Sequence, residues 1–278
     1  MTPYSQGVAR PLVMGILNVT PDSFFDGGRY LQTSAALARG REILEEGADI
    51  VDVGGESTRP GARPVDEREE LARVLPVVEG LAGESQIASG RARISVDTTT
   101  PAVAEAAVKA GAAIVNDVSA SLVELAADLG VGYIAMHCKG SPADMQDDPH
   151  YDDVVSEVAE FLAERAGAAK AAGVGELYID PGIGFGKTAR HNLELLASLE
   201  RLCDLGWPVL VGTSRKAFIG RVAAGDLEAA PLELSARFEG SLTTAVWSMA
   251  KGAAAVRVHD VAATVAAARL VAATGWER

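Results

Sequence analysis

Polar side chains of two chemical kinds stand at the ends of short apolar runs in this chain of 278 residues. The first kind comprises two carboxylates and an amide, namely Asp97, Asp180 and Asn116. A carboxylate inside a protein needs a hydrogen-bonding partner, because burying it without one is too costly. These three residues therefore predict a site for a flat heterocycle that carries several N–H donors and a carbonyl group.

The second kind is mostly cationic and matches an anion such as a phosphate or a pyrophosphate. It comprises Arg59, Lys216, Arg257 and His259, together with Asn18. Arg257 and His259 are two residues apart at the end of one run, so both should point to the same side of a strand. The two kinds together predict a site with hydrogen-bond acceptors on one side and phosphate-binding groups on the other.

Simpler explanations exist for single residues. Asp97 or Asp180 alone would more often cap a helix, but polar residues end every apolar run, which capping does not explain. His137 has two open interpretations, a buried hydrogen-bonded role and a ligand role. The Gly-rich stretch Gly182–Lys187 resembles a phosphate-binding loop but lacks the required spacing, so it is a weak indicator.

The elements that must position these residues alternate between apolar runs and Ala/Leu-rich helical stretches. Continuous rather than alternating hydrophobicity is typical of strands buried on both faces, and strands alternating with helices indicate parallel βαβ units. Eight such units predict an α/β protein, a (β/α)₈ TIM barrel whose active site lies at the carboxyl ends of the strands. We expect one domain over residues 1–278, with an ordered core of about 11–273. The predicted strands are Leu12–Leu17, Ile50–Val53, Arg93–Val96, Ala113–Val115, Tyr133–Met136, Leu177–Ile179, Val209–Val211 and Ala254–Val258.

Helix ends and loops are also marked in the sequence. Glycines that follow a helical stretch and precede a strand predict left-handed C-caps, in the segments EGAD, KAGAA, AAGVG and AKGAAA. Thr100 followed by Pro101 predicts a Thr-capped helix with proline at its first position. Ser141–Asp152 predicts an extended loop, and Gly225–Pro231 a mobile turn between two helices.

Composition narrows the class of protein. The net charge of −13 disfavours non-specific nucleic-acid binding. The two cysteines, Cys138 and Cys203, provide neither a disulfide framework nor a zinc-binding spacing. Met1–Pro11 lacks the apolar segment of a secretory signal, and no run of about eighteen apolar residues predicts a membrane span. We therefore expect a cytoplasmic protein with no nucleic-acid or membrane partner.

Several long motifs resemble those of the dihydropteroate synthases, a pterin-binding enzyme family. They are MGILNVTPDSFFDGG (Met14–Gly28), DVGGESTRPGA (Asp52–Ala62), SVDTTTPAVAEAAVKAGAAIVNDVS, YIDPGIGFGKT, VGTSRKAFIG and VRVHDV. The resemblance runs in the family's order from about Leu12 to Val271. It implies a transferase of folate biosynthesis that condenses 6-hydroxymethyl-7,8-dihydropterin pyrophosphate with p-aminobenzoate. It further implies Mg²⁺, a homodimer, and sulfonamides as mimics of aminobenzoate.

The resemblance also assigns roles to residues. The pterin would be held by Asp97, Asn116, Met136, Asp180 and Lys216, with Arg257 stacked on the ring. Pyrophosphate and aminobenzoate would be bound by Thr58, Arg59, Pro60, Phe185, Ser214, Arg257 and His259. Phe24 and Asp26 would close over the site, and Asn18 would help to bind Mg²⁺. The residues expected to act in catalysis are Asp97, Lys216, Arg257 and His259.

Three features depart from the family pattern and concern fine specificity. Cys138 and Lys139 replace more common residues, the segment after Asn116 is short, and Ala217 stands where many relatives have Ser. Two rival functions share the pterin-binding acceptors: a methyltransferase barrel that uses methyl-tetrahydrofolate, and an inert paralogue that only binds. The Ser-Arg-Lys segment and the first loop motif favour the synthase.

Overall fold

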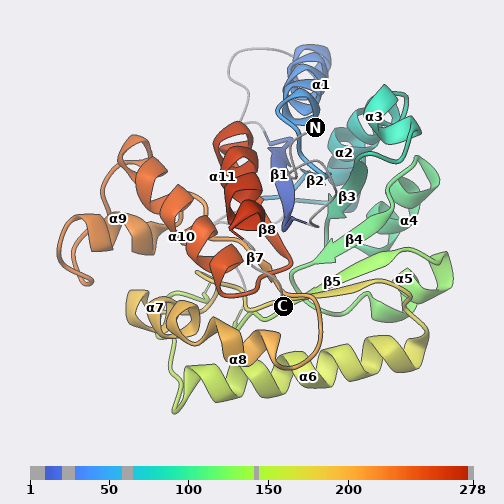
Figure 1. Cartoon of the computed structure of the whole chain (residues 1–278). Coiled ribbons are helices and arrows are strands. Elements are labelled where there is room, and N and C mark those ends of the chain that lie inside the picture. Colours follow the sequence, from blue (N-terminus) through green and yellow to red (C-terminus); the bar gives the residue numbers. More distant parts are fainter. Residues whose placement is uncertain (1–9, 21–28, 58–64, 141–143, 275–278) are drawn as a thin grey trace.

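Eight parallel strands form a nearly closed barrel with helices around it (Figure 1). The computed structural model describes residues 10–20, 29–57, 65–140 and 144–274. In that part of the chain, β1 lies between β2 and β8, and a bridge between Ile179 and Val209 joins β6 to β7. The predicted single-domain (β/α)₈ barrel is thereby confirmed. The strands are β1 (Leu12–Asn18), β2 (Ile50–Gly54), β3 (Arg93–Asp97), β4 (Ile114–Asp117), β5 (Gly132–Met136), β6 (Leu177–Asp180), β7 (Leu210–Val211) and β8 (Ala255–Val258).

Helices cover the outside of the barrel between successive strands (Figure 1). No helix among the described residues is both long enough and apolar enough to cross a membrane. The helices are α1 (Arg29–Glu45), α2 (Glu67–Ala82), α3 (Ser85–Ala88), α4 (Pro101–Lys109), α5 (Val123–Leu129), α6 (Val154–Ala172), α7 (Ala189–Ala197), α8 (Leu199–Cys203), α9 (Ala217–Ala223), the 3-10 segment η3 (Leu234–Arg237), α10 (Phe238–Ala250) and α11 (Val261–Ala273).

The glycines predicted to end helices do adopt the left-handed conformation. Their φ angles are 93° at Gly47, 120° at Gly111, 92° at Gly173 and 95° at Gly252. A residue with a Cβ would be strained at these angles, which explains why glycine separates each helix from the next strand.

The start of α4 is confirmed in one respect and corrected in another. Pro101 is the first residue of the helix and Thr100 stands at the N-cap position, as predicted. The Thr100 side chain, however, makes no capping hydrogen bond, because its hydroxyl donates to Glu70 Oε2 at 2.9 Å. A contact with another helix thus replaces the local cap.

Two predicted loops are also present. Residues 144–152, the described part of the first, contain neither helix nor strand. Gly225–Pro231 connects α9 to η3. Its mobility stays a prediction.

The core has two parts because strand side chains alternate between the two faces of the sheet. The barrel interior is filled by one layer of apolar side chains: Met14, Ile50, Ile114, Ile134, Tyr178, Leu210 and Ala255. The larger part is one cluster of strand and helix residues, which includes Val13, Val51 and Val96 of the strands and Ile43 and Val77 of the helices. Each large apolar side chain removed from water contributes roughly 1.5–3 kcal/mol, so this layer holds the strand ends in place.

The two ends of the barrel are built differently. At the amino ends of the strands, Arg93 Nη1 donates to Glu176 Oε2 at 2.5 Å, and Tyr178 Oη donates to Glu176 Oε1 at 3.1 Å. The polar residues at the carboxyl ends of the strands lie on the far side of the apolar layer.

Candidate functional site

A hydrogen-bonded cluster at the barrel mouth joins residues that lie far apart in the sequence. Arg257 on β8 donates from Nε to Asp52 Oδ2 and from Nη2 to Asp97 Oδ2, both at 2.6 Å. Asn116 Nδ2 donates to Asp52 Oδ2 at 3.1 Å. Asp97 and Asn116 face each other in the register of β3 and β4. The barrel thus brings Asp97, Asn116 and Arg257 together.

Burial makes the charges in this cluster costly. It raises the pKa of Asp97 to about 7, although the Arg257 guanidinium opposes the shift. Burial also lowers the pKa of Arg257, but Asp52 and Asp97 outweigh it and hold the pKa above its usual value. A ligand that donates hydrogen bonds to the carboxylates would relieve part of this cost, because such bonds favour the ionised form.

Asp180 adds a further acceptor on the neighbouring side of the mouth. It ends β6 opposite Met136, the last residue of β5. Its Oδ1 accepts a hydrogen bond from the Gly182 amide at 2.7 Å. Burial raises the pKa of Asp180, while the charges of Lys216 and Arg257 lower it. These couplings link Asp180 to the Arg257 cluster.

Lys216 occupies the side of the mouth formed by the connection after β7. Its Nζ donates to the Ile183 carbonyl and lies 4.6 Å from the centroid of the Phe185 ring. A side chain at Gly184 would lie 2.9 Å from the Lys216 Cδ, so glycine there leaves room for the lysine stem. Burial lowers the pKa of Lys216 to about 8, so the ammonium is held at a cost near neutral pH.

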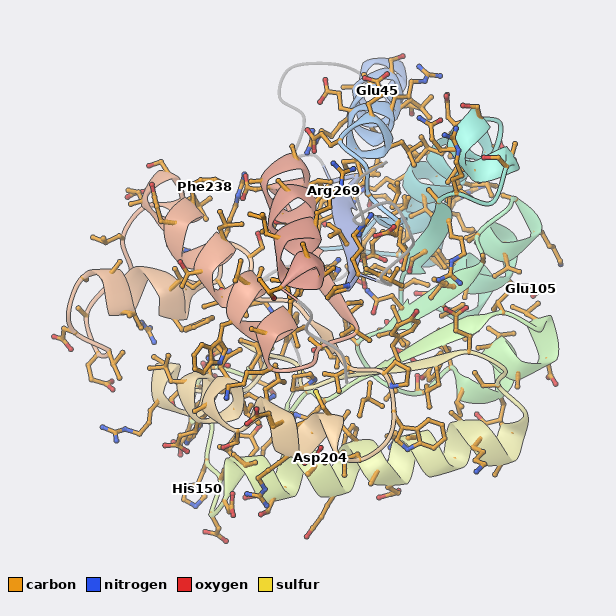
Figure 2. All side chains as sticks on the ribbon, viewed as in Figure 1. Glu45, Glu105, His150, Asp204, Phe238 and Arg269 are labelled. Atoms are coloured by element: carbon orange, nitrogen blue, oxygen red, sulfur yellow. The ribbon has the colours of Figure 1, made fainter. Side chains whose placement is uncertain are left out.

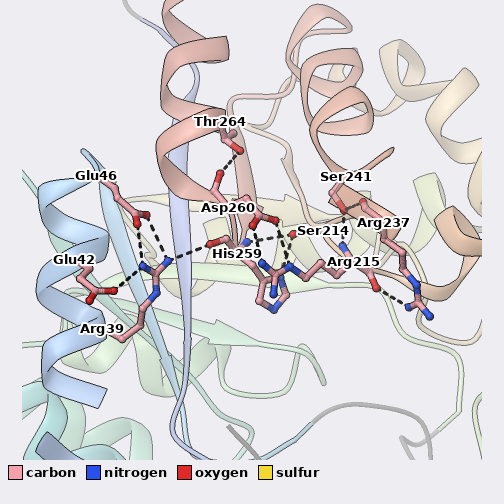
Figure 3. Close-up of polar contacts among 10 residues, drawn as sticks. All are labelled: Arg39, Glu42, Glu46, Ser214, Arg215, Arg237, Ser241, His259, Asp260 and Thr264. Atoms are coloured by element: carbon pink, nitrogen blue, oxygen red, sulfur yellow. Dashed lines mark hydrogen bonds and ion pairs between the residues drawn. The ribbon is translucent and has the colours of Figure 1, made fainter. Parts of the chain in front are cut away.

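Ser214 and His259 form a second polar face at the ends of β7 and β8 (Figure 3). The Ser214 Oγ lies 3.0 Å from His259 Nδ1 and accepts from the His259 amide at 3.2 Å. Behind them Arg215 Nη2 donates to Asp260 Oδ1 at 2.6 Å, and Arg39 Nη2 donates to the His259 carbonyl at 3.2 Å. These contacts fix both the backbone and the ring of His259.

A cavity of about 400 Å³ opens beside this face. Its lining contains the first turn of α11 and two arginines, each paired with an acid: Arg39 with Glu46 at 2.9 Å and Arg215 with Asp260 at 2.6 Å. The acids balance the arginine charges, so the cavity lining by itself does not favour anions. The lining residues are Ile16, Arg39, Glu46, Arg215, His259, Asp260, Val261, Ala262 and Ala263.

The sequence matches the family model described as pterin binding enzyme over residues 14–259. The chain belongs to the pterin-binding enzyme family. It is 44% identical over 276 residues to the dihydropteroate synthase of Escherichia coli (strain K12), covering 97% of this chain and 94% of the relative.

Solved structures in the pterin-binding enzyme family agree. The dihydropteroate synthase of Xanthomonas albilineans with 4-aminobenzoic acid matches with a TM-score of 0.86 and 47% identity, over 98% of this chain and 95% of that one. The same organism's enzyme in complex with 7,8-dihydropteroate matches with a TM-score of 0.83 and 44% identity, over 98% and 96%. The resemblance to dihydropteroate synthases is confirmed, as is the prediction of a transferase that acts in folate synthesis.

The other predicted site residues of this pterin-binding enzyme fall into two groups. Asn18 ends β1 opposite Gly54, at the mouth. Phe24, Asp26, Thr58, Arg59 and Pro60 lie outside the described residues, so their predicted roles stay predictions.

Asp52 is one of the polar residues that end the predicted strands, but the sequence assigns it no role in the site. It is fully buried, and its Oδ2 accepts from both Arg257 and Asn116. Its position two residues before the last residue of β2 puts it on the same face of the strand as Gly54. That spacing is a signal in the sequence, but it does not reveal the partner from β8.

The two interpretations of His137 are separated by its neighbours. The side chain is buried, and Lys187 Nζ lies 2.9 Å from its Nδ1. Burial and the Lys187 charge lower the pKa of His137 to about 3. Burial lowers the pKa of Lys187 to about 7. The structure therefore favours the buried, hydrogen-bonded role.

The glycines of Gly182–Lys187 serve close packing. Gly182 and Gly186 have φ angles of 62° and 61°, and a side chain at either would collide with the carbonyl oxygens of His137 and Lys139. Lys187 points inward and donates to the Gly182 carbonyl at 3.0 Å. The stretch thus packs the loop after β6 against the loop after β5, which accounts for its glycines without a phosphate.

Proposed function

We propose that this enzyme condenses 6-hydroxymethyl-7,8-dihydropterin pyrophosphate with p-aminobenzoate, forming 7,8-dihydropteroate and pyrophosphate. The observation that carries the proposal is the barrel mouth, where buried acceptors on one side face anion-binding groups on the other. The 44% identity to a dihydropteroate synthase over nearly the whole chain supports the same substrates.

The pterin ring fits the acceptor side. Its N–H groups would donate to Asp97 and Asp180, and the Asn116 amide can both donate and accept. Met136 is buried at the end of β5 and supplies an apolar wall. Arg257 is oriented by Asp52 and Asp97, which suits it to stack on the ring.

Aminobenzoate would lie between the pterin and the connection after β6. The contact between Lys216 and the Phe185 ring supports a position beside that ring and the lysine stem. Pro60 would form the opposite wall, as the family resemblance implies. Sulfonamides would compete for the same position.

The pyrophosphate would bind between Arg257 and the Ser214–His259 face. Thr58 and Arg59 would add contacts from the second loop. Asn18 offers an amide oxygen, a ligand of the kind that Mg²⁺ accepts. Among the described residues, no group of three His, Cys, Asp or Glu is placed to hold a metal ion. When bound, Mg²⁺ would neutralise charge on the leaving group.

The reaction breaks a C–O bond and forms a C–N bond at the pterin methylene carbon. We propose a dissociative order, in which pyrophosphate leaves with the bonding electrons before the arylamine lone pair attacks. The arylamine then loses one proton to water. The electron-rich pterin stabilises the positive charge at the methylene carbon, and the Asp97 carboxylate stabilises it further. An arylamine is neutral at pH 7, so no strong base is required.

Loop closure would protect that cation from water. Phe24 and Asp26 in the first loop, and Thr58 to Pro60 in the second, are proposed to close over the bound substrate. Hydrogen exchange in both loops should slow when pterin pyrophosphate and Mg²⁺ are added. Exchange rates that do not change would contradict the closure.

Pyrophosphate release tests the proposed function. The wild-type chain should release pyrophosphate only when both substrates and Mg²⁺ are present. Turnover of methyl-tetrahydrofolate instead would indicate the rival methyltransferase, and pterin binding without any turnover would indicate the inert paralogue. The cytoplasmic location stays a prediction.

We further propose a homodimer that is formed through α9 to α11. The exposed large apolar side chains of the described residues lie in this region: Val222, Leu232, Leu234, Phe238, Trp247 and Leu270. Exposed apolar side chains on neighbouring elements such as α9, η3, α10 and α11 are typical of an interface between identical subunits.

Light scattering tests the dimer. Leu234→Glu combined with Leu270→Glu should halve the mass in solution. Lys109→Glu on α4 is the matched charge control, because it also lowers the net charge by two, and Glu105 of that helix and Phe238 lie on opposite sides of the barrel (Figure 2). A monomeric wild type, or a double variant that stays dimeric, would contradict the proposal.

A further inference from the structure

Glu70 is a fully buried acid outside the barrel that none of the proposed binding contacts uses. It lies in the first turns of α2, and both of its oxygens accept hydrogen bonds. Thr98 Oγ1 donates to Oε1 at 2.6 Å, and Thr100 Oγ1 donates to Oε2 at 2.9 Å. An apolar residue would be less costly to bury, so the acid at this position calls for an explanation beyond packing.

Its two partners form the turn that follows Asp97. Thr98 is the next residue in the chain and is itself buried. The Thr98 hydroxyl also accepts from the Thr100 amide at 3.0 Å, and the Thr98 amide donates to the Asn116 carbonyl at 3.1 Å. Thr98 therefore bonds to Glu70 through its side chain. Its backbone follows Asp97 and bonds to Asn116.

The same helix also holds the end of the preceding strand. Arg73 Nη1, one turn after Glu70, donates to the Gly55 carbonyl at 2.7 Å. A side chain at Gly55 would lie 2.7 Å from Val74 Cγ2 and 3.1 Å from Glu70 Cγ. The chain after β2 thus passes directly against Glu70, and α2 bonds to the connections after both β2 and β3.

We propose that Glu70 is a positioning residue for the transferase reaction, which aims the Asp97 carboxylate into the barrel mouth by holding Thr98 and Thr100. This inference rests on the proposed function, because it assigns Asp97 to the pterin. Loss of the Glu70 contacts should let the turn after β3 relax. Asp97 should then keep its ion pair with Arg257 but bind the pterin less well.

Steady-state kinetics of three variants and one control variant tests the role. Glu70→Gln keeps the shape but replaces one acceptor with a donor, and Thr98→Val removes the shorter hydrogen bond. Each should lower kcat/KM for the dihydropterin pyrophosphate about tenfold, the effect of one hydrogen bond, while KM for aminobenzoate stays unchanged. Thr98→Ser retains the hydroxyl and should restore wild-type kcat/KM. Glu67→Gln, an exposed change on the same helix, is the matched control.

A double-mutant cycle separates positioning from a purely structural role. In an Asp97→Asn background, Glu70→Gln should cause no further loss of kcat/KM, because the group that it positions is already altered. Additive losses, or losses that follow the folded fraction in a melting curve, would overturn the inference. So would wild-type kinetics of Glu70→Gln, which leaves the proposed function intact. A wild-type chain without turnover would overturn both.

Discussion

Both ends of the barrel contain an arginine bound to an acid, but the surroundings shift the pKa of the two acids in opposite directions. At the amino end, burial raises the pKa of Glu176, yet its bonds with Arg93 outweigh burial and leave the pKa below its usual value. At the mouth, burial prevails for three groups, raising the pKa of Asp97 and Asp180 and lowering that of Lys216, whereas the acids around Arg257 hold its pKa above the usual value.

The difference distinguishes a structural pair from a binding site. Arg93 and Glu176 satisfy each other and are partly solvated, so their charges are stable without a ligand. At the mouth Arg257 is shared between Asp52 and Asp97, and Asp52 Oδ1 has no partner among the described residues. Charges that burial makes costly are those that a ligand can stabilise.

The largest expected contrast is in turnover. Asp97→Asn should lower kcat/KM for the pterin substrate on the order of 10²–10³-fold, the usual effect of removing one group that stabilises developing charge. Lys216→Ala should act similarly. Glu176→Gln, the matched change at the other end, should leave pyrophosphate release near the wild-type rate. Equal losses at both ends, or wild-type rates in the mouth variants, would contradict the distinction.

A second contrast lies in the pH profile of kcat/KM. Asp97 offers both oxygens as acceptors and stabilises positive charge only when it has lost its proton, so activity should fall below its pKa of about 7. Lys216 is cationic only below its pKa of about 8, so activity should fall again above that value. Asp97→Asn should remove the acidic limb and Lys216→Arg the basic one. Limbs that persist in both variants would show that other groups titrate.

The smallest contrast is in stability. Glu176 and Asp97 should change the free energy of unfolding with opposite signs as the pH rises. The pKa of Glu176 is lowered by folding, so its stabilisation exists above its unfolded pKa and disappears as the pH falls through the folded value. Glu176→Gln should therefore cost about 0.5–1 kcal/mol at pH 7 and nothing in acid.

Asp97 has a raised pKa, so its contribution is present in acid and is lost as the pH rises through about 7. Asp97→Asn should flatten the decline of the unfolding free energy as the pH rises toward 7. Urea unfolding at a series of pH values measures both variants. Parallel pH dependences for the two would refute the contrast.

Local patterns in the sequence determined the barrel and the composition of its mouth. Continuous apolar runs require strands buried on both faces, and glycines such as Gly111 and Gly173 end helices through their own backbone preferences. Because parallel strands place all their carboxyl ends on one side, the polar residues after them, including Asp97, Asn116 and Arg257, were predictable as neighbours.

Only the tertiary structure decided which side chains pair. Asp52 binds Arg257 across 205 residues, Thr100 turns from its helix to Glu70, and Lys187 is buried against His137. These pairings depend on closure of the barrel and on how each helix lies against it, and no short-range preference of the chain contains that information.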